Sequence, residues 1–354
     1  MGDLQLSFAM TPYDRVMPLI TGEVKPAGIT LDYQGMPGAV PGVFYDQIKF
    51  RRYDISEMSF SSFLVERAKG WPYRILPVFH NRNFSYTDIV IRRSSGIRPD
   101  HPEDLRGKRF GIGDYQQTGG LWIRGVLWHE FGIRPEDLEW HQTRGRRYSH
   151  TGASGTQPPV PIHYADAGIG ALFLRGAIDA AWGWGGGSDT ALARPDADVR
   201  GDPDFTTLFS DPKAEAIRYY RKTGIYPPHH TTAVRESILS EHPWVATSLL
   251  EAFERAKQRA AERLRYQTLF VFGTHYLDEV RSVLGDDPFV HGVRANAAAI
   301  DLVRTMSAEQ HLTSRAQPLE ELFPEEVLIA EERLPVPSVA DGSSSTKVTT
   351  DAAP

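Results

Sequence analysis

The sequence predicts an α/β fold with a largely parallel sheet, in a chain long enough for two lobes. Short apolar runs typical of strands alternate with stretches of helical period through the first third of the chain. Such alternation favours strands joined by helices, which form parallel sheets. The chain has 354 residues, enough for two substantial cores. Ligands of such folds bind beyond the carboxyl ends of the strands, so the site is expected there.

The predicted elements follow the order of the chain. Residues 4–9 alternate apolar and polar side chains, as a half-buried strand does, and Pro12 suits the first turn of a helix that reaches about residue 20. Further strands are expected at 29–33, 54–60, 75–79, 87–92, 109–113, 139–142, 177–182 and 206–209, with an extended segment at 225–234. Further helices are expected at 40–50, 63–69, 121–131, 166–175, 212–223, 243–264, 277–284 and 295–310. Residues 143–161 are rich in Arg, Gly, Ser and Pro and are expected to form a long loop.

Composition excludes several classes of function. The formal net charge is -6, which argues against a general nucleic-acid binder because such proteins carry a basic face. The chain has no cysteine, which excludes disulfides, thiolate metal ligands and cysteine nucleophiles. The first residues lack the pattern of a signal peptide, and no apolar run reaches membrane-spanning length. We therefore expect a cytoplasmic protein without a membrane partner.

Polar residues follow three of the predicted strands. Thr11 follows the first strand, Ser59, Ser61 and Ser62 lie at the end of the strand at 54–60, and Arg82 follows the strand at 75–79. The carboxyl ends of these strands should meet at one edge of the sheet, where a ligand binds. The serines could bind a carboxylate or phenol oxygen through hydroxyls and backbone amides. They could equally cap the helix that follows them, which is a common role for serine.

A polar loop at 114–120 leads into the helix expected from residue 121. A helix N-terminus presents free backbone N–H groups, which suit an anion, so we expect this junction to hold the carboxylate end of a small ligand. Tyr115 and Thr118 lie in the loop and are expected to line the pocket. Arg124 lies one turn inside the helix.

Several stretches resemble a known family. Residues 104–112 resemble the turn and strand that open the second lobe of periplasmic binding proteins of the type II fold. Residues 113–127 are similar to the loop and helix of the 4,5-dihydroxyphthalate decarboxylase family, which uses that fold. The other stretches that fit the family are 57–63, 226–231, 286–296 and 312–323. The resemblance covers roughly residues 3–325.

The resemblance implies a two-lobed α/β protein with a type II periplasmic-binding-protein-like fold and an interlobe cleft. Lobe 1 would comprise residues 1–90 and 224–334, and lobe 2 residues 91–223. Residues 335–354 are polar and aperiodic, and we expect a disordered tail there. The resemblance further implies a carboxy-lyase that decarboxylates a hydroxylated aromatic acid such as 4,5-dihydroxyphthalate without an organic cofactor.

His229 and His230 lie on the extended segment that leads back to the first lobe. Neighbours on a strand face opposite sides, so only one of the two can easily face the cleft. The resemblance favours His230 as the acid that protonates the ring carbon, and histidine can donate a proton near neutral pH. The alternative is a histidine that is hydrogen-bonded at the hinge.

Arg82 and Arg124 are candidates for binding a carboxylate, because a guanidinium group pairs with it through two hydrogen bonds. For Arg124 an ion pair with the neighbouring lobe is the alternative. Trp182 and Trp184 could stack on an aromatic ring or form a pair in the core. The chain departs from the family's pattern at Tyr86, where a histidine is expected, and after Trp182, where residues 183–187 contain no arginine.

No spacing of His and carboxylate residues is typical of a metal site, so no metal ligands are assigned. A role for a divalent ion is left as an open alternative. His141, His150 and His163 are expected at the surface. No glycine cluster fits a dinucleotide or phosphate loop. The expected partner is a small aromatic carboxylate, and a homo-oligomer stays open. The alternative function is a non-catalytic solute-binding protein for a small aromatic or carboxylate ligand, with the same cleft.

Overall fold

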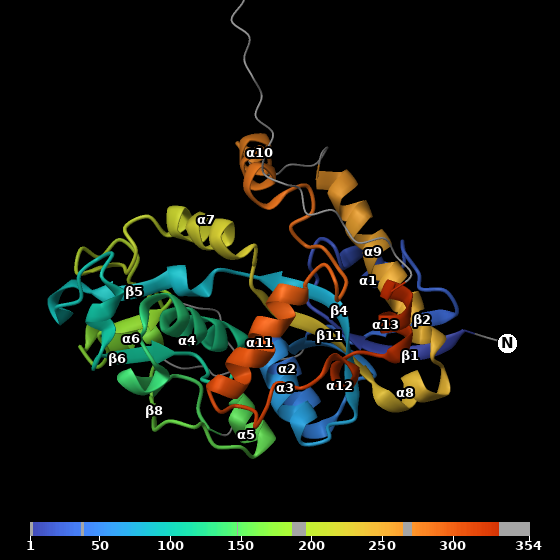
Figure 1. Ribbon diagram of the computed structural model, residues 1–354, viewed down its shortest axis with the longest axis horizontal. Helices are drawn as coiled ribbons and strands as arrows, with labels where there is room; N and C mark the ends of the chain where they lie inside the picture. The colour runs from blue at the N-terminus through green and yellow to red at the C-terminus, as the bar shows by residue number, and fades with distance from the viewer. Residues whose placement is uncertain (1–2, 37–38, 147, 186–195, 265–270, 333–354) are drawn as a thin grey trace, which may run out of the picture.

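Two β-sheets, one in each lobe, organise the protein (Figure 1). The computed structural model describes residues 3–36, 39–146, 148–185, 196–264 and 271–332. Helices pack around both sheets, so the predicted α/β class is confirmed. The tail expected at 335–354 lies outside the described residues.

The sheet of the first lobe has the strand order β2 (Ile29–Tyr33), β1 (Leu4–Ala9), β3 (Ile55–Ser59), β11 (Pro228–Arg235) and β4 (Tyr73–Arg82). The first three strands are parallel to one another, whereas β11 is antiparallel to both of its neighbours. The chain therefore leaves this lobe after β4, builds the second lobe, and returns as β11 between β3 and β4. The start of β11 then lies beside the carboxyl ends of β3 and β4, where a ligand is expected.

The sheet of the second lobe has the order β10 (Phe205–Thr207), β5 (Ile89–Arg92), β9 (Ala180–Trp182), β6 (Arg109–Ile112), β7 (Glu139–Gln142) and β8 (Ile162–Tyr164). Strands β9, β6, β7 and β8 are parallel, and β5 runs antiparallel to β9 and β10. Strand β8 was not predicted from the sequence, because it is only three residues long and lies directly after the glycine-rich and proline-rich stretch.

Most predicted helices are present, with ends shifted by a few residues. The helices are α1 (Met17–Ile20), α2 (Ala39–Phe50), α3 (Phe60–Ala68), α4 (Thr118–Phe131), α5 (His150–Ser154), α6 (Ile169–Leu174), α7 (Pro212–Thr223), α8 (Glu236–Glu241), α9 (Trp244–Leu264), α10 (Gly273–Leu284), α11 (Ala297–Glu309), α12 (Leu319–Leu322) and α13 (Glu325–Glu332). The expectation of a loop throughout 143–161 is wrong, because α5 forms there. Ser149 caps α5 by accepting the backbone N–H of Gly152.

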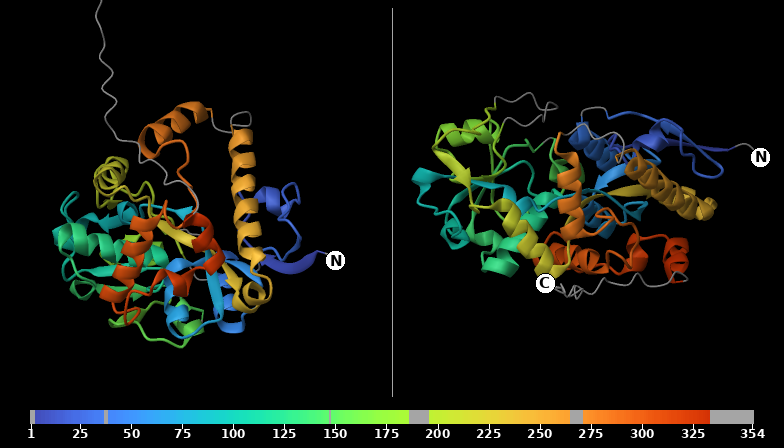
Figure 2. Two further views of the ribbon diagram at one scale, coloured as in Figure 1. Left: turned by 45° about the vertical axis from the view of Figure 1, so that its right-hand side comes forward. Right: turned by 90° about the horizontal axis from the view of Figure 1, so that it is seen from above.

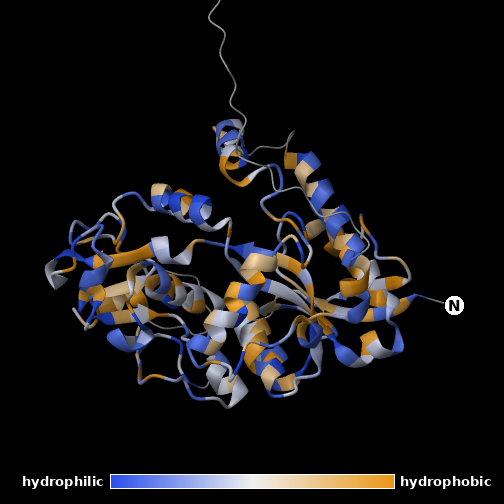
Figure 3. Cartoon of the chain, viewed as in Figure 1, coloured by the Kyte–Doolittle hydropathy of each residue, from blue (hydrophilic) through white to orange (hydrophobic). Residues whose placement is uncertain are grey.

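The apolar residues that the pattern placed inside do form the core. Figure 3 shows polar colouring along α7, which covers the outside, whereas helix α4 buries nearly its whole first two turns. One apolar cluster joins the lobes and contains side chains of α3, α4 and α11, among them Phe63, Trp122 and Ile300. Helix α11 packs closely on α4, since a Cβ atom at Gly125 would lie 1.9 Å from the Met306 sulfur. Helix α11, which follows the return of the chain to the first lobe, therefore holds the two lobes together.

Helix α9 packs on the core of the first lobe over most of its length, through residues such as Leu249 and Phe253. Its C-terminal end and helix α10 form an arm that projects beyond both lobes (Figures 1 and 2). Of the described side chains of α10, only Gly273 is buried. Apolar residues near its start are strongly exposed, with Val271 at 93% and Phe272 at 63%. Helix α10 contacts the rest of the protein at α7, where Lys213 pairs with Glu279.

Candidate active site

The centre of the candidate site is a carboxylate–histidine pair on adjacent strands. Glu57 lies in β3 and His230 at the start of β11, whose antiparallel register brings the two side chains together. His230 Nδ1 lies 2.6 Å from Glu57 Oε1. The Tyr13 hydroxyl donates to the same oxygen at 2.8 Å, and the Thr11 backbone N–H donates to Oε2 at 3.0 Å. We call Glu57 and His230 the dyad.

Glu57 is fully buried and ionised. Burial alone would raise the pKa of Glu57, but the hydrogen bond and charge of His230 outweigh it and lower the pKa to about 2. Burial and the nearby carboxylate raise the pKa of the Tyr13 hydroxyl well above its ordinary value. Tyr13 therefore keeps its proton and donates a hydrogen bond to Glu57. A fixed negative charge therefore lies against Nδ1 of His230, and Nε2 is the ring nitrogen that is left for other partners.

Two neighbouring histidines are neutral and engaged elsewhere. His229 faces away from the dyad, and its Nε2 lies 3.1 Å from the Asn83 carbonyl oxygen and 3.2 Å from Ser85 Oγ. His80 Nε2 lies 2.6 Å from Thr232 Oγ1. Burial lowers the pKa of both histidines from 6.5 to about 3. His229 and His230 thus face opposite sides, and His230 is the one that meets a carboxylate.

These pKa values predict that the protein loses stability as the pH falls below 6.5. The unfolded chain then takes up protons at His80 and His229, whereas the folded protein does so only near pH 3. The free energy of unfolding should fall by about 1–2 kcal/mol per histidine between pH 6.5 and about pH 5. Glu57 adds to this loss below pH 4.5, where the unfolded carboxylate is protonated first. Melting temperatures measured by calorimetry across this range test the prediction, and a constant value would contradict it.

The N-termini of α3 and α4 meet where the lobes touch, and we call this contact the lobe junction. Thr118 Oγ1 accepts the backbone N–H of Ser61 at 3.0 Å and lies 2.9 Å from Ser59 Oγ. Ser59 precedes α3 but does not cap it through its own side chain. The Ser61 hydroxyl is buried and has no hydrogen-bond partner. The predicted serines and Thr118 are therefore brought together across the two lobes.

A second set of contacts at the lobe junction comes from α5. His150 Nδ1 lies 2.7 Å from Ser62 Oγ of the first lobe, and its backbone N–H donates to Asp114 at 2.8 Å. The expectation that His150 is a surface residue is wrong, because only 2% of it is exposed. The ring of Phe44 lies between two histidines, with ring centres 5.7 Å from His150 and 4.9 Å from His230. Asp114 is buried, and the nearby positive groups outweigh burial and lower its pKa.

Trp182 packs over the start of α4. A Cβ atom at Gly119 would lie only 2.3 Å from the Trp182 ring, so this contact requires glycine. The Trp182 ring also lies 6.4 Å from that of His229. Trp182 is thus placed at the lobe junction. Of the other residues expected there, Thr11 contributes its backbone N–H to Glu57.

Arg82, Arg124 and Tyr115 do not join the dyad. Arg82 donates to the carbonyl oxygens of Tyr226 and Val290 and to the side chain of Asn296. It therefore lies where the chain passes between the lobes, at the end of β4 and before the start of β11. Arg124 donates to the Tyr115 carbonyl and to Gln310, each at 2.8 Å, and stacks 3.7 Å above the Tyr115 ring. The Tyr115 ring is buried against Trp140. Both guanidinium groups are thus used inside the protein, and neither contacts the dyad in this structure.

Three other residues that the sequence singled out, Tyr86, His141 and His163, contact groups outside the dyad. Tyr86 is buried and donates to Glu215 of α7 at 2.9 Å. His141 and His163 stack on each other with ring centres 4.9 Å apart, both near Glu139. Within the described ranges, no three His, Asp or Glu side chains are grouped closely enough to hold a metal ion.

Sequence reasoning missed Glu57 and Tyr13, whereas His80 follows a predicted strand and lies at the edge of the sheet where a ligand is expected. A signal for Glu57 was available, because a carboxylate in the middle of an apolar strand must find partners when it is buried. For Tyr13 no comparable signal exists, since a tyrosine is ordinary in the segment where it occurs.

Comparison with known proteins identifies the family. The chain is 31% identical over 332 residues to the 4,5-dihydroxyphthalate decarboxylase of Comamonas testosteroni, which covers 91% of this chain and 97% of the relative. The chain belongs to the 4,5-dihydroxyphthalate decarboxylase family. It is also 32% identical over 229 residues to the enzyme of that name from Pseudomonas putida, covering 62% of this chain and 83% of the relative. The predicted family is confirmed, and membership makes the chain a carboxy-lyase. No family model matches the chain.

Solved structures confirm the periplasmic-binding-protein fold. The aliphatic sulphonate binding protein SsuA of Escherichia coli superimposes with a TM-score of 0.53 at 12% identity, covering 91% of this chain and 92% of SsuA. A periplasmic sulfonate-binding protein from Methylobacillus flagellatus KT gives a TM-score of 0.54 at 11% identity, covering 93% and 94%. Identities this low show the fold alone. None of the described helices is both long and apolar enough to span a membrane.

Proposed function

We propose that this protein removes a carboxyl group, without oxidation, from a hydroxylated aromatic acid similar to 4,5-dihydroxyphthalate. The observation that carries the proposal is the dyad, in which a buried, ionised Glu57 lies 2.6 Å from His230 beside the lobe junction. The relatives named 4,5-dihydroxyphthalate decarboxylase support the choice of substrate.

In the proposed reaction, His230 donates a proton to the ring carbon that bears the leaving carboxylate. A phenolic oxygen ortho or para to that carbon supplies the electron density for the new C–H bond. The bond to the carboxylate then breaks, its electron pair restores the aromatic ring, and CO2 leaves. Water returns a proton to His230. General acid catalysis of this kind is worth about 10²–10⁴-fold, and the remainder comes from orientation and electrostatics.

Glu57 is proposed to position His230 and to stabilise its charged form. With Nδ1 hydrogen-bonded to the carboxylate, only Nε2 can deliver a proton to the substrate. The negative charge of Glu57 offsets the positive charge that His230 carries before the transfer. Tyr13 and the Thr11 backbone hold the carboxylate in place.

The lobe junction is proposed to bind the substrate once the lobes separate. The Thr118–Ser61 and His150–Ser62 hydrogen bonds join the two lobes, so a substrate needs them to open and then to close again. A carboxylate that is not removed would take the place of Thr118 Oγ1 at the α3 N-terminus and accept from the free Ser61 hydroxyl. If the protein binds the second carboxylate, the reacting carboxylate makes no stabilising contacts in the ground state. Its loss as CO2 is then not slowed by such contacts.

The proposal needs no organic cofactor, because the ring itself accepts the electrons of the broken bond. Incubation of the full chain with 4,5-dihydroxyphthalate and with related hydroxybenzoates, followed by CO2 release and the absorbance of the substrate, tests it. We expect stoichiometric CO2 from 4,5-dihydroxyphthalate. Tight binding without CO2 at every pH tried would overturn the proposal and favour a solute-binding protein. Parallel samples treated with a chelator test whether a metal takes part, since activity that is lost and then restored by a divalent ion would show that it does.

A further inference from the structure

The Phe44 ring contacts two histidines that come from different lobes. Its centre lies 4.9 Å from that of His230, in the dyad of the first lobe, and 5.7 Å from that of His150, in α5 of the second lobe. It meets the two imidazoles at steep interplanar angles of 87° and 74°. A single six-membered ring is therefore wide enough to touch both histidines, and the aromatic ring of the proposed substrate has the same width.

His150 Nδ1 is bonded to a hydroxyl that leaves it when the lobes separate. Ser62 Oγ, 2.7 Å from Nδ1, is buried and belongs to α3 of the first lobe. The lobe opening that admits a substrate breaks this hydrogen bond, so Nδ1 then needs another partner. A phenolic hydroxyl can replace the serine hydroxyl there, because both can donate and accept a hydrogen bond.

The start of α3 connects the two histidines. Ser59 of β3 is opposite His230 in the antiparallel register, and α3 begins at the next residue and carries Ser62 to His150. A substrate that lies along this segment can present one ring position to each histidine. When the hydroxyl is para to the leaving carboxylate, the carbon that gains a proton and the oxygen that loses one are one ring width apart.

Two ion pairs flank His150. In its own lobe, Asp114 accepts the His150 backbone N–H at 2.8 Å and pairs with Arg144 at 3.1 Å. On the side of the first lobe, Glu66 and Lys69 pair at 2.7 Å, and both contact α5. Each pair is neutral as a whole, so neither opposes a proton on the His150 ring. An imidazole can accept such a proton near neutral pH.

We infer that His150 is a second catalytic residue, which binds the phenolic hydroxyl para to the leaving carboxylate and takes its proton. This inference rests on the function proposed above. As His230 protonates the ring carbon, His150 accepts the phenolic proton, and the electrons of the O–H bond form a carbonyl, so the ring becomes a dienone. The bond to the carboxylate then breaks and CO2 leaves. Its electron pair restores the aromatic ring, and the oxygen recovers its proton from His150.

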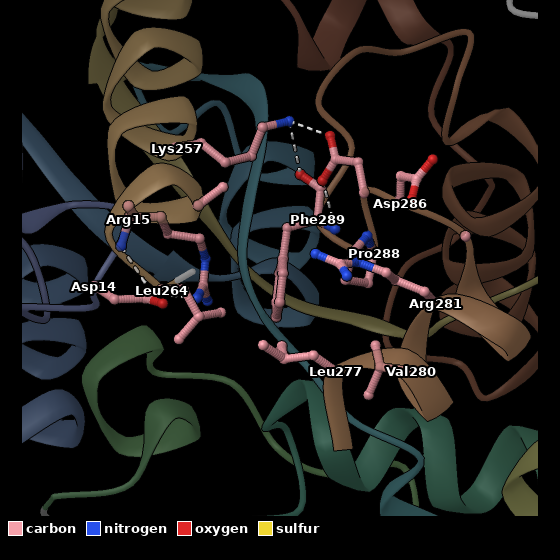
Figure 4. A pocket seen from close by; sticks show the side chains of 14 residues that line it. Asp14, Arg15, Lys257, Leu264, Leu277, Val280, Arg281, Asp286, Pro288 and Phe289 are labelled. Atoms are coloured by element: carbon pink, nitrogen blue, oxygen red, sulfur yellow. Dashed lines mark hydrogen bonds and ion pairs between the residues drawn. The ribbon is translucent and has the colours of Figure 1, made fainter. Parts of the chain in front are cut away.

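The cavity beside the arm is a different place (Figure 4). It measures about 780 Å³, and neither His150 nor His230 lines it. Acidic and basic side chains both line it, so it does not favour an anion. Ala261, an exposed residue of α9, is part of its lining. The variant Ala261→Trp therefore shows whether an affinity measured for the whole protein arises in that cavity.

Calorimetric titration with 4,5-dihydroxyphthalate and with phthalate, which lacks both hydroxyls, tests the hydroxyl contact. The full chain carries His230→Gln in these titrations, so that turnover does not disturb them. We expect the dihydroxy acid to bind about tenfold more tightly or better, as one additional hydrogen bond implies. Ala261→Trp should leave both affinities unchanged. His150→Phe, which cannot hydrogen-bond to the hydroxyl, should bring the two affinities within about threefold of each other.

Steady-state kinetics of His150→Asn test the removal of the proton, because asparagine can hydrogen-bond to a hydroxyl but cannot take its proton. With 4,5-dihydroxyphthalate, kcat should fall by about 10²–10⁴-fold. With 4-hydroxy-5-nitrophthalate it should fall much less, since the nitro group leaves this phenol ionised near neutral pH. His163→Asn is the matched control, because His163 is exposed on β8 and stacks on His141, away from the lobe junction.

Two results would overturn the inference. Equal affinity for the hydroxylated and unhydroxylated acids would exclude the hydroxyl contact, and this comparison holds even if the His150 variants unfold, which their melting temperatures show. An unchanged kcat in His150→Asn, or the same loss with both substrates, would leave His150 only a role in holding the lobes together. Absence of CO2 from the unaltered protein would instead overturn the proposed function and the catalytic role with it, whereas the affinities show separately whether His150 binds the hydroxyl.

Discussion

His230→Gln should lower kcat for 4,5-dihydroxyphthalate by about 10²–10⁴-fold, the range expected when a general acid is lost. Glutamine keeps a side-chain amide that can hydrogen-bond to Glu57, so the buried carboxylate retains a partner. It cannot transfer a proton to carbon at neutral pH. KM should change little, because the substrate is proposed to be held mainly at the lobe junction.

His129→Gln is the matched control for this experiment. His129 is partly exposed on α4 and pairs with Glu309 on α11, away from the dyad. We expect kcat of this variant to equal that of the unaltered protein. A normal kcat in His230→Gln, with the control also normal, would remove His230 from the reaction.

Glu57→Gln should lower kcat by about 10²-fold or more, as does loss of the carboxylate that orients a catalytic histidine in other enzymes. The neutral amide cannot offset the charge on His230, and its NH2 group can hold His230 in the wrong tautomer. The variant should also lose about 1–3 kcal/mol of unfolding free energy, because a charged hydrogen-bond acceptor is removed from a buried network. Steady-state kinetics and chemical denaturation measure the two effects.

Tyr13→Phe distinguishes the effect of the Glu57 charge on His230 from the effect of the hydrogen bonds that hold Glu57 in place. This change removes one donor to Glu57 but leaves the ionised carboxylate against His230. We therefore expect a smaller fall in kcat than in Glu57→Gln. Equal losses in the two variants would indicate that Glu57 contributes only hydrogen-bonded structure, and an unchanged kcat in Glu57→Gln would exclude its proposed role.

The fold was predictable because its signals are local. Alternation at 4–9 and helical period at 243–264 each report on one element, and the structure places β1 and α9 there. Helix α5 was missed because its formation depends on distant groups. The buried side chain of Asp114 accepts the His150 backbone N–H across 36 positions, and no local pattern reports such a contact.

The site was predictable only in part, for a similar reason. Ser59, Ser61 and Thr118 lie at the strand and helix ends where the fold brings ligands, and they do meet. Arg82 also lies at the end of a strand, β4. The direction of its side chain, however, is set by carbonyl oxygens more than 140 positions away in the chain. Glu57 could not be recognised as the partner of His230 without knowing that β11 pairs with β3.

The place of β11 in the sheet has a consequence for how the site arises during synthesis. Glu57 and His230 are 173 positions apart in the chain, and β11 separates β3 from β4. A ribosome must therefore complete all the strands of the second lobe before the first sheet can close. Until then Glu57 has neither its histidine nor a neighbouring strand on that side, so a nascent chain carries the carboxylate of the dyad without the proton donor that it positions.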